Sequence, residues 1–243
     1  SFCHVQICTE ITMENYSIQE GGFLLIDKPI RWTSFDVVKK LRNISGIKKI
    51  GHAGTLDPLA TGLLIVCYGK YTKKIESMQA QEKGYVGTFE LGKTTPSYDL
   101  ETAIDREFPI HHISNELIEA TLDQFRGEIK QVPPQFSAVK VNGKRAYEHA
   151  RNGNSIALKV RNATVSKFDV DCEKFPTIAF NIKCSKGTYI RSLARDFGEA
   201  LQSGAYMSSL IRTSIGTYHV KDAVSMTNIH EKDDFFNHAM QLI

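Results

Sequence analysis

The chain has 243 residues, of which 42% are hydrophobic and 23% are charged. This balance is typical of a folded globular protein and excludes the disordered, collagen-like and coiled-coil classes. The longest apolar run, Leu63–Cys67, is much shorter than the roughly 18 residues that a membrane-spanning helix requires. No secretory or mitochondrial targeting sequence is expected, because the first basic residue is Lys28.

The charges and cysteines indicate the cellular compartment and the kind of ligand to expect. The five cysteines contain no C-x-x-C pair, so we expect a reducing compartment, the cytoplasm, and no metal centre. The formal net charge is only +3, but seven basic residues and one acidic residue lie between 139 and 167, and five basic residues and no acidic residue lie between 37 and 56. Such stretches fit either an ordinary solvated surface or a surface that binds a polyanion.

Hydrophobic spacing predicts one continuous domain over residues 23–243, preceded by a lead-in over residues 1–22. The first element is a strand at 23–27, and Ser34 is expected to cap a helix that ends at Gly46. The later elements, in chain order, are strands at 63–67 and 84–91, a helix from Ser114, a tight turn at Asn142-Gly143, a short helix from Ala146, strands at 155–170 and 177–184, a helix at 189–202, a strand at 205–218 and a helix at 229–242.

Strands dominate this order and do not alternate strictly with helices. The expected fold class is therefore α+β, with a mixed, largely antiparallel central sheet flanked by helices and loops.

Residues 87–94 satisfy the phosphate-binding pattern G-x-x-x-x-G-K-[ST], but we do not expect a nucleotide site there. Such a loop needs a strand before its first glycine and a helix that begins at its lysine. In this chain the strand pattern runs through the would-be loop, and Pro96 prevents a helix.

Residues 51–62, GHAGTLDPLATG, form the segment with the most chemical information. Its three glycines let backbone and ligand approach closely, and Asp57 is its one acidic residue. One interpretation makes Asp57 a helix N-cap, with Pro58 at the first helical position. Because Gly62 leaves room for barely one helical turn, a functional carboxylate is an equally good interpretation.

The same segment resembles the signature of the TruB family of tRNA pseudouridine-55 synthases. Further matching segments follow the family's order along the chain, which argues against chance similarity. They are LIDKP at 25–29, KGY at 83–85, QVPP at 131–134, SAVK at 137–140, GKRAYE at 143–148, CSKGTYIR at 184–191 and LIR at 210–212.

The resemblance implies the pseudouridine synthase fold and isomerisation of the T-loop uridine at position 55 of tRNA, without a cofactor or a metal. Asp57 matches the catalytic aspartate, which meets C1′ while the glycosidic bond breaks and C1′ rejoins to C5 of the same base. Arg191 matches the arginine placed beside that aspartate, where a guanidinium keeps a carboxylate ionised. Tyr85 matches the active-site tyrosine, which is expected to stack on the target base.

Other matches imply roles in substrate binding. The target uridine must be flipped out of the folded T-loop, and His52 matches the histidine that fills the gap. Lys28, Tyr189 and Leu210 match residues that support the loop and pocket, although each also fits a purely structural role. Residues 126–153 correspond to the family's RNA-gripping insertion. The cations expected to bind RNA phosphates are Lys140, Lys144, Arg145, Arg151 and, beyond the insertion, Arg212.

Only 27 residues follow Gly216, so no complete C-terminal PUA domain is expected, unlike in many family members. We expect a monomer that binds the T-arm of tRNA, without a membrane or an obligate protein partner. Two alternatives stay open: a guide-RNA-dependent rRNA pseudouridine synthase, which shares the aspartate loop, and a non-catalytic chaperone that folds tRNA.

Overall fold

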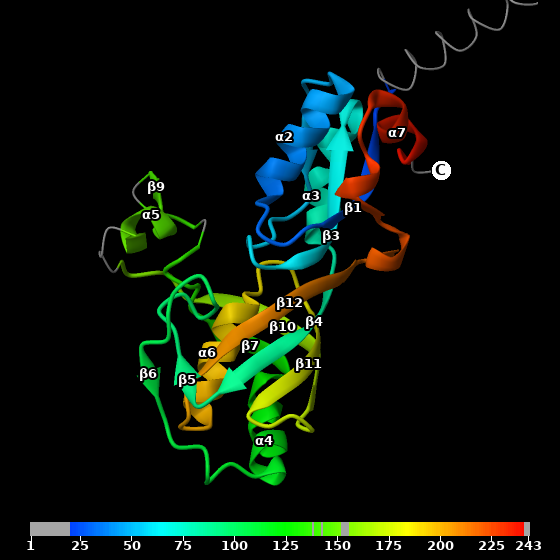
Figure 1. The fold of residues 1–243 in the computed structure, drawn as a ribbon. Helices are drawn as coiled ribbons and strands as arrows, with labels where there is room; N and C mark the ends of the chain where they lie inside the picture. The colour runs from blue at the N-terminus through cyan, green and yellow to red at the C-terminus, as the bar shows by residue number, and fades with distance from the viewer. Residues whose placement is uncertain (1–19, 138, 142, 152–155, 241–243) are drawn as a thin grey trace, which may run out of the picture. The chain divides into compact units, whose positions relative to one another are not determined.

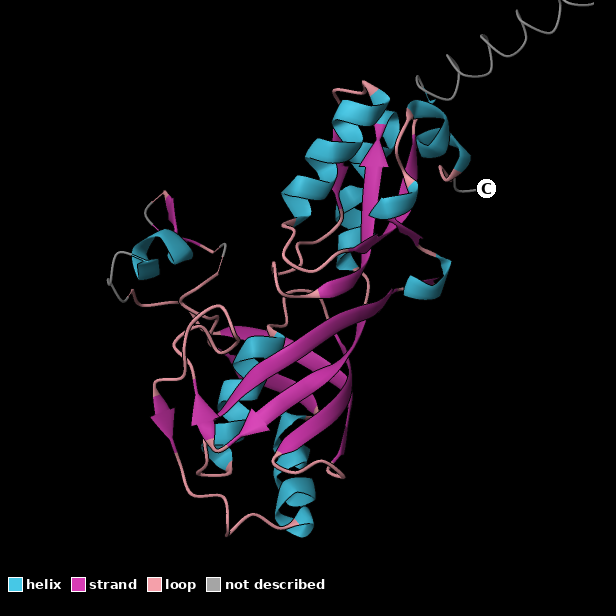
Figure 2. Ribbon diagram, in the orientation of Figure 1, coloured by secondary structure: helices cyan, strands magenta, loops and turns pink. Residues whose placement is uncertain are grey.

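The computed structural model describes residues 20–137, 139–141, 143–151 and 156–240, so most of the expected lead-in lies outside the described residues. The chain forms two compact units. The first unit consists of the segment that ends at Gln81 and the segment from Arg212 onward, and the second consists of residues 82–211. Each unit combines helices with strands (Figures 1 and 2).

The first unit is built on two long strands, β1 (Gly22–Lys28) and β3 (Thr61–Tyr68), with helix α2 (Ser34–Ser45) packed beside them (Figure 1). Its other elements are β2 (Ile50–His52), η1 (Gly69–Lys74), α3 (Ile75–Ala80), β13 (Tyr218–His219), η3 (Val220–Asp222), β14 (Val224–Ser225), η4 (Met226–Asn228) and α7 (Lys232–Asn237).

Side chains that alternate along β1 bury both faces of this strand. Leu24 and Ile26 pack in the cluster that includes α2, whereas Phe23 and Leu25 pack in a second cluster with Met78 of α3. A strand buried on both faces needs apolar side chains at successive positions, which explains the uninterrupted apolar runs in the sequence.

Helix α2 is capped by Thr33 and not, as predicted, by Ser34. Thr33 Oγ1 accepts a hydrogen bond from the Asp36 amide (3.0 Å), and the Asp36 carboxylate accepts one from the Thr33 amide (2.8 Å). This reciprocal pair is a capping box, and it favours Thr33 because an acidic residue stands three positions after it. The predicted end of the helix at Gly46 is confirmed, with φ at +72°.

The second unit contains strands β4 (Lys83–Leu91), β7 (Gly127–Gln131), β10 (Arg161–Asp171), β11 (Thr177–Cys184) and most of β12 (Ala205–Ile215), with helices α4 (Asn115–Leu122) and α6 (Ile190–Ala200). Its shorter elements are β5 (Lys93–Thr94), β6 (Arg106–Glu107), η2 (Asp123–Phe125), β8 (Lys140–Val141), β9 (Lys144–Arg145) and α5 (Ala146–Arg151). Phe89, Phe168 and Phe197 are fully buried in its core, and the Phe89 ring lies 4.4 Å from that of Phe180.

Ten of the described strands form one sheet in the order β14-β1-β3-β12-β4-β11-β10-β7, with β2 beside β3 and β13 beside β12. The pairs β5–β6 and β8–β9 form two small separate sheets. β1 pairs with β14 in parallel and with β3 antiparallel. The pairs β4–β11, β11–β10 and β10–β7 are all antiparallel. This mixed, largely antiparallel sheet confirms the predicted α+β class.

Several predicted elements are confirmed, and others are shorter than predicted, among them the helix predicted at 189–202, which covers Ile190–Ala200. Helix starts at Ser114 and Ala146 are confirmed, and Gly143 (φ +83°) lies in the turn between β8 and β9, while Asn142 lies outside the described residues. The strand predicted from 155 begins at Arg161. The strand predicted to reach 218 ends at Ile215, because Gly216 adopts φ +54° and reverses the chain into β13.

The last helix covers only Lys232–Asn237 instead of 229–242, because Glu231 and Asp234 form a capping box that fixes its start. The strand predicted through the first part of residues 87–94 is confirmed. β4 runs through the would-be phosphate loop to Leu91, and a second short strand, β5, follows the turn at Gly92 where a nucleotide-binding loop would need a helix.

Candidate functional site

Asp57 lies in the loop, residues 53–60, that joins β2 to β3 in the first unit. The Ala60 amide donates to the Asp57 carbonyl (3.1 Å), which closes a turn with Pro58 at its second position, and no helix follows. The interpretation of Asp57 as a helix cap is therefore wrong. Its side chain is half-buried, and helix capping no longer explains the carboxylate.

Hydrogen bonds with four side chains tie this loop and the start of β3 to the rest of the unit. The Leu56 amide donates to Ser34 Oγ (2.9 Å), so Ser34, which does not cap α2, anchors the residue before Asp57. The Gly62 amide donates to Asp27 Oδ1 (3.1 Å) at the end of the loop. Lys28 and Arg212 supply the other bonds, and together these contacts hold the backbone on both sides of Asp57.

Lys28 is fully buried, and its ammonium donates to three backbone carbonyls. These belong to Trp32 (2.6 Å), Pro29 (2.9 Å) and Pro58 (3.3 Å). Burial lowers the pKa of Lys28 from 10.5 to about 8, while the negative charge of Asp57 opposes the shift. Lys28 therefore joins the end of β1 to the residue that follows Asp57, and it remains largely protonated at neutral pH.

Arg212 was expected to bind RNA, but only 1% of its surface is exposed. Its Nε donates to the Leu63 carbonyl (2.7 Å), and its terminal nitrogens donate to the carbonyls of Gly54 (3.1 Å) and Thr55 (3.4 Å). An arginine that is buried against backbone carbonyls offers no exposed guanidinium to a phosphate. The observed contacts therefore fit a role in shaping the Asp57 loop.

His52 is the last residue of β2, immediately before this loop. Burial and the positive charge of Arg212 lower the pKa of His52, so the imidazole is neutral at neutral pH. Its Nδ1 atom is buried and has no hydrogen-bond partner among the described residues. A neutral, half-buried ring is suited to stacking against a base.

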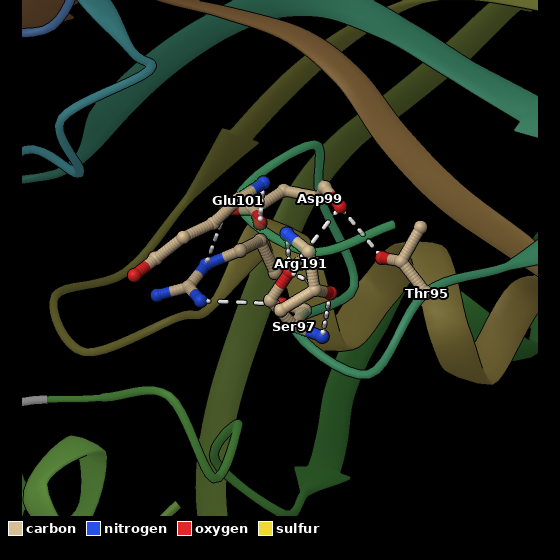
Figure 3. A network of polar contacts seen from close by, with 6 residues as sticks. Thr95, Ser97, Asp99, Glu101 and Arg191 are labelled. Atoms are coloured by element: carbon tan, nitrogen blue, oxygen red, sulfur yellow. Dashed lines mark hydrogen bonds and ion pairs between the residues drawn. The ribbon is translucent and has the colours of Figure 1, made fainter. Parts of the chain in front are cut away.

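Arg191 lies at the start of α6 in the second unit and is 4% exposed. Figure 3 shows its side chain among residues of the loop at 95–101. Its Nε lies 3.7 Å from Oδ2 of Asp99, which is equally buried, and its NH1 group donates to the Ser97 carbonyl (3.2 Å). Asp99 also accepts a hydrogen bond from the Glu101 amide (2.9 Å), and Thr95 Oγ1 donates to the Asp99 carbonyl (2.6 Å). The 95–101 loop thus holds the guanidinium with the Asp99 carboxylate and the Ser97 carbonyl.

The sequence did not predict the part played by this loop, TPSYD at 95–99 with the two residues that follow. Asp99 and Arg191 stand far apart in the sequence, and no local spacing connects them. An acidic residue three positions after Pro96 was the available signal.

Three further predicted residues lie in the second unit. Tyr85 is 8% exposed in β4, and Leu210 is 6% exposed in β12. Tyr189 is the N-cap residue of α6, and both its amide and its carbonyl bond to the side chain of buried Gln131, at 2.9 and 3.1 Å. Gln131 thereby fixes the backbone two residues before Arg191.

The predicted RNA-binding insertion contains β7, the β8–β9 hairpin and α5 in its described part. The side chains of its four predicted cations, Lys140, Lys144, Arg145 and Arg151, lie outside what the structure describes. In the described part of the chain, no three His, Cys, Asp or Glu side chains are grouped as metal ligands. No helix there is long and apolar enough to cross a membrane.

The predicted residues therefore fall into two groups. In the first unit, one loop carries Asp57, and around this loop lie Lys28, His52 and Arg212. Tyr85, Tyr189, Arg191 and Leu210 belong to the second unit, in which Arg191 is held by the 95–101 loop. The structure adds Ser34, Asp99 and Gln131, whose contacts orient these residues.

Comparisons with solved structures identify the fold. A Cbf5 chain in a Cbf5–Nop10–Gar1 complex matches with a TM-score of 0.67 and 28% identity over 88% of this chain. An H/ACA ribonucleoprotein bound to a substrate RNA matches with a TM-score of 0.65 and 26% identity over 90% of this chain. This chain spans only 55% and 54% of those two chains. The fold, the aspartate loop and these neighbours define a pseudouridine synthase.

Sequence comparisons identify the family. The model for the N-terminal domain of TruB family pseudouridylate synthases matches residues 42–190, and that for the C-terminal domain of tRNA pseudouridylate synthase B matches residues 191–240. A tRNA pseudouridine synthase B from Flavobacterium johnsoniae is 54% identical over 91% of this chain and 99% of its own length. Another from Phocaeicola vulgatus is 50% identical over 88% and 94%. The chain belongs to the TruB family.

Proposed function

We propose that this chain converts the uridine at position 55 in the T-loop of tRNA into pseudouridine. The observation that carries the proposal is the match to TruB across residues 42–240, within which Asp57 is the one acidic residue of a loop held by buried side chains. Relatives of nearly the same length, at about 50% identity, are named tRNA pseudouridine synthase B.

The reaction needs one group that can attack or stabilise the electron-poor sugar carbon C1′. The bond between C1′ and N1 breaks, C1′ rejoins the base at C5, and the hydrogen on C5 is replaced by one on N1, so the product is an isomer of the substrate. A carboxylate can bond to C1′ as a nucleophile or stabilise positive charge on the sugar. We assign this role to Asp57.

Lys28 and Arg212 act on the backbone that carries Asp57. They bond the carbonyls of Pro58, Gly54 and Thr55, which lie within three residues of Asp57 on either side. Small displacements of a reacting group reduce rates strongly, so a loop fixed from both sides favours a productive geometry. We therefore reassign Arg212 from RNA binding to positioning, and we give Lys28 the same role.

The remaining predicted residues keep the roles that the family resemblance implies. A uridine in a folded T-loop must leave its stack before it can react, at a cost of a few kcal/mol. The neutral His52 ring would fill the vacated position, and Tyr85 would stack on the flipped base. Arg191, oriented by Asp99, would support the ionised carboxylate, and Tyr189 and Leu210 would shape the pocket. Lys140, Lys144, Arg145 and Arg151 would bind phosphates of the T-arm.

We further propose that the enzyme is a cytoplasmic monomer that needs no metal, cofactor or protein partner. The guide-RNA-dependent alternative is less well supported, because identity to the Cbf5 chain is 28% against 54% to the tRNA pseudouridine synthase B of Flavobacterium johnsoniae. A chaperone that only folds tRNA would use the same surface, and it differs from an enzyme in making no product.

An unmodified tRNA transcript distinguishes these functions. The purified chain is incubated with the transcript alone, and pseudouridine is mapped by site. Product at position 55 and at no other uridine is the expected result. Product that requires an added guide RNA would support the alternative enzyme, and bound tRNA without any product would support the chaperone.

A further inference from the structure

We infer that a groove beside α2 in the first unit, which the proposed function does not use, binds the RNA strand next to the target uridine. This inference rests on the proposed function, because it takes the substrate RNA as the ligand. The groove has a volume of about 420 Å³ and is open to solvent. It is lined by Arg31, Trp32, Asp36, Lys39, Lys40 and Asn43.

The groove is positively charged. Arg31, Lys39 and Lys40 are exposed cations, and Asp36 is the one acidic residue in the lining. The Asp36 carboxylate is occupied by hydrogen bonds from the Thr33 amide (2.8 Å) and hydroxyl (2.6 Å) in the helix cap. In the described part of the chain, neither the Arg31 guanidinium nor the Lys40 ammonium has an ion-pair partner. These cations are available to neutralise phosphates.

A backbone hydrogen bond joins one wall of the groove to the Asp57 loop. The Arg31 amide donates to the Pro58 carbonyl (2.7 Å), so one wall of the groove is bonded to the residue that follows Asp57. Arg31 adopts φ +69°, a conformation that favours glycine and that costs about 1 kcal/mol or more for other residues. Arg31, with its long charged side chain, therefore stands beside the loop although its backbone conformation is unfavourable for arginine.

Aromatic groups stand next to the cations. Phe35 lies on α2 next to the groove lining, one turn before Lys39, and is 60% exposed. Trp32 of the lining is half-buried and packs against the core on one side. Exposed aromatic rings next to cations are the combination that binds single-stranded nucleic acid, because the rings stack on bases while the cations bind the backbone. A wholly acidic peptide would satisfy the cations but would leave the Phe35 ring without a stacking partner.

The first test removes the charge. Lys39→Gln/Lys40→Gln is compared with Lys174→Gln/Lys221→Gln, which removes two exposed lysines elsewhere. Dissociation constants are measured over a range of salt concentrations for unmodified tRNA and for the isolated T-arm stem-loop. The groove variant should bind both RNAs about tenfold more weakly, and its salt slope should fall by about one to two units. The control should match the wild-type chain.

The second test separates stacking from charge. Phe35→Leu keeps an apolar side chain and removes the ring, so it should weaken binding of both RNAs about tenfold without changing the salt slope. Arg31→Gly relieves the backbone conformation, so it should fold at least as well as the wild-type chain while lowering both affinity and salt slope.

The outcomes are decisive. If every groove variant binds both RNAs as tightly as the control does, the inference is overturned. A loss confined to full-length tRNA would overturn its claim that the groove binds next to the target uridine. A loss from the lysine variant without one from Phe35→Leu would indicate a general anion surface and would also overturn it. These binding constants are informative even if the wild-type chain forms no pseudouridine, so failure of the proposed function is recognised separately.

Discussion

Lys28 and Arg212 are long cations buried in the same unit, with their nitrogens against backbone carbonyls of the Asp57 loop and its neighbours. Lysine and arginine are rarely buried to this extent unless their donors are bonded. Here the bonded carbonyls satisfy the donors, and the charge of Asp57 compensates part of the cost for Lys28. At the scale of residues, cations in the core thus shape the loop that carries the proposed catalytic carboxylate.

The buried Lys28 predicts a specific dependence of stability on pH. Its pKa is about 8 in the folded chain, against 10.5 for an unperturbed lysine. Between these values the unfolded chain binds more protons, so the free energy of unfolding rises with pH across this window and is unaffected below it. Relative to Lys28→Met, the wild-type chain should gain about 2 kcal/mol between pH ~7.5 and pH ~9.5 in urea unfolding. A stability difference that stays constant with pH would contradict this assignment.

The buried pair of Asp99 and Arg191 leads to a second prediction, on the free energy of unfolding. Asp99→Asn removes the charge that faces buried Arg191, which should cost about 3 kcal/mol or more in the free energy of unfolding. The control is Asp123→Asn, whose carboxylate contacts Arg126 at 2.6 Å but is 74% exposed, so its loss should cost less than about 1 kcal/mol. Equal losses in both variants would show that burial of the Asp99 pair does not matter.

At the scale of elements, the conformation of the Asp57 loop depends on a close backbone contact between Gly62, which follows the loop, and Arg212 in β12. Gly62 adopts φ +98°, and a Cβ atom placed there would lie 2.4 Å from the Arg212 carbonyl oxygen and 2.7 Å from its amide nitrogen. No side chain fits without moving one of the two segments. Because Arg212 also bonds the loop through its side chain, the same residue fixes the loop at both ends.

Gly62→Ala should therefore destabilise the chain by about 2 to 4 kcal/mol, since it combines an unfavourable φ with overlap against backbone atoms. Gly46→Ala is the matched control. Gly46 also has a positive φ of +72°, but a Cβ atom there would meet nothing within 4 Å. That control should lose only about 1 kcal/mol. Urea unfolding measures both, and similar losses would show that the contact with Arg212 is unimportant.

At the scale of the whole molecule, the second unit is one continuous segment that leaves the first unit after Gln81 and returns at Arg212. The boundary between the two family models, at residues 190 and 191, instead falls at the start of α6. Strand β12 carries the chain from the second unit back to the first, so it links the buried Leu210 to Arg212.

Features set by local sequence could be predicted, and features set by distant contacts could not. β1, β3, β4 and the Gly46 end of α2 follow from apolar runs and a glycine stop signal. The role of Ser34, by contrast, depends on Leu56, whose amide bonds the Ser34 hydroxyl from 22 residues away, while Thr33 forms the cap with Asp36. The burial of Arg212 and the contacts of Arg191 with the 95–101 loop are tertiary features. Arg191, for example, bonds Ser97 across 94 residues of sequence. Family resemblance located Asp57 but gave no indication of these supports.

The role of Asp57 is tested most directly by replacing its carboxylate with an amide of nearly the same shape. Asp57→Asn is incubated with an unmodified tRNA transcript under single-turnover conditions, and pseudouridine at position 55 is quantified beside the dissociation constant for the transcript. The rate should fall by at least about a thousandfold while tRNA affinity stays within about threefold of that of the wild-type chain. Pseudouridine formation at a rate near that of the wild-type chain would show that another group attacks C1′.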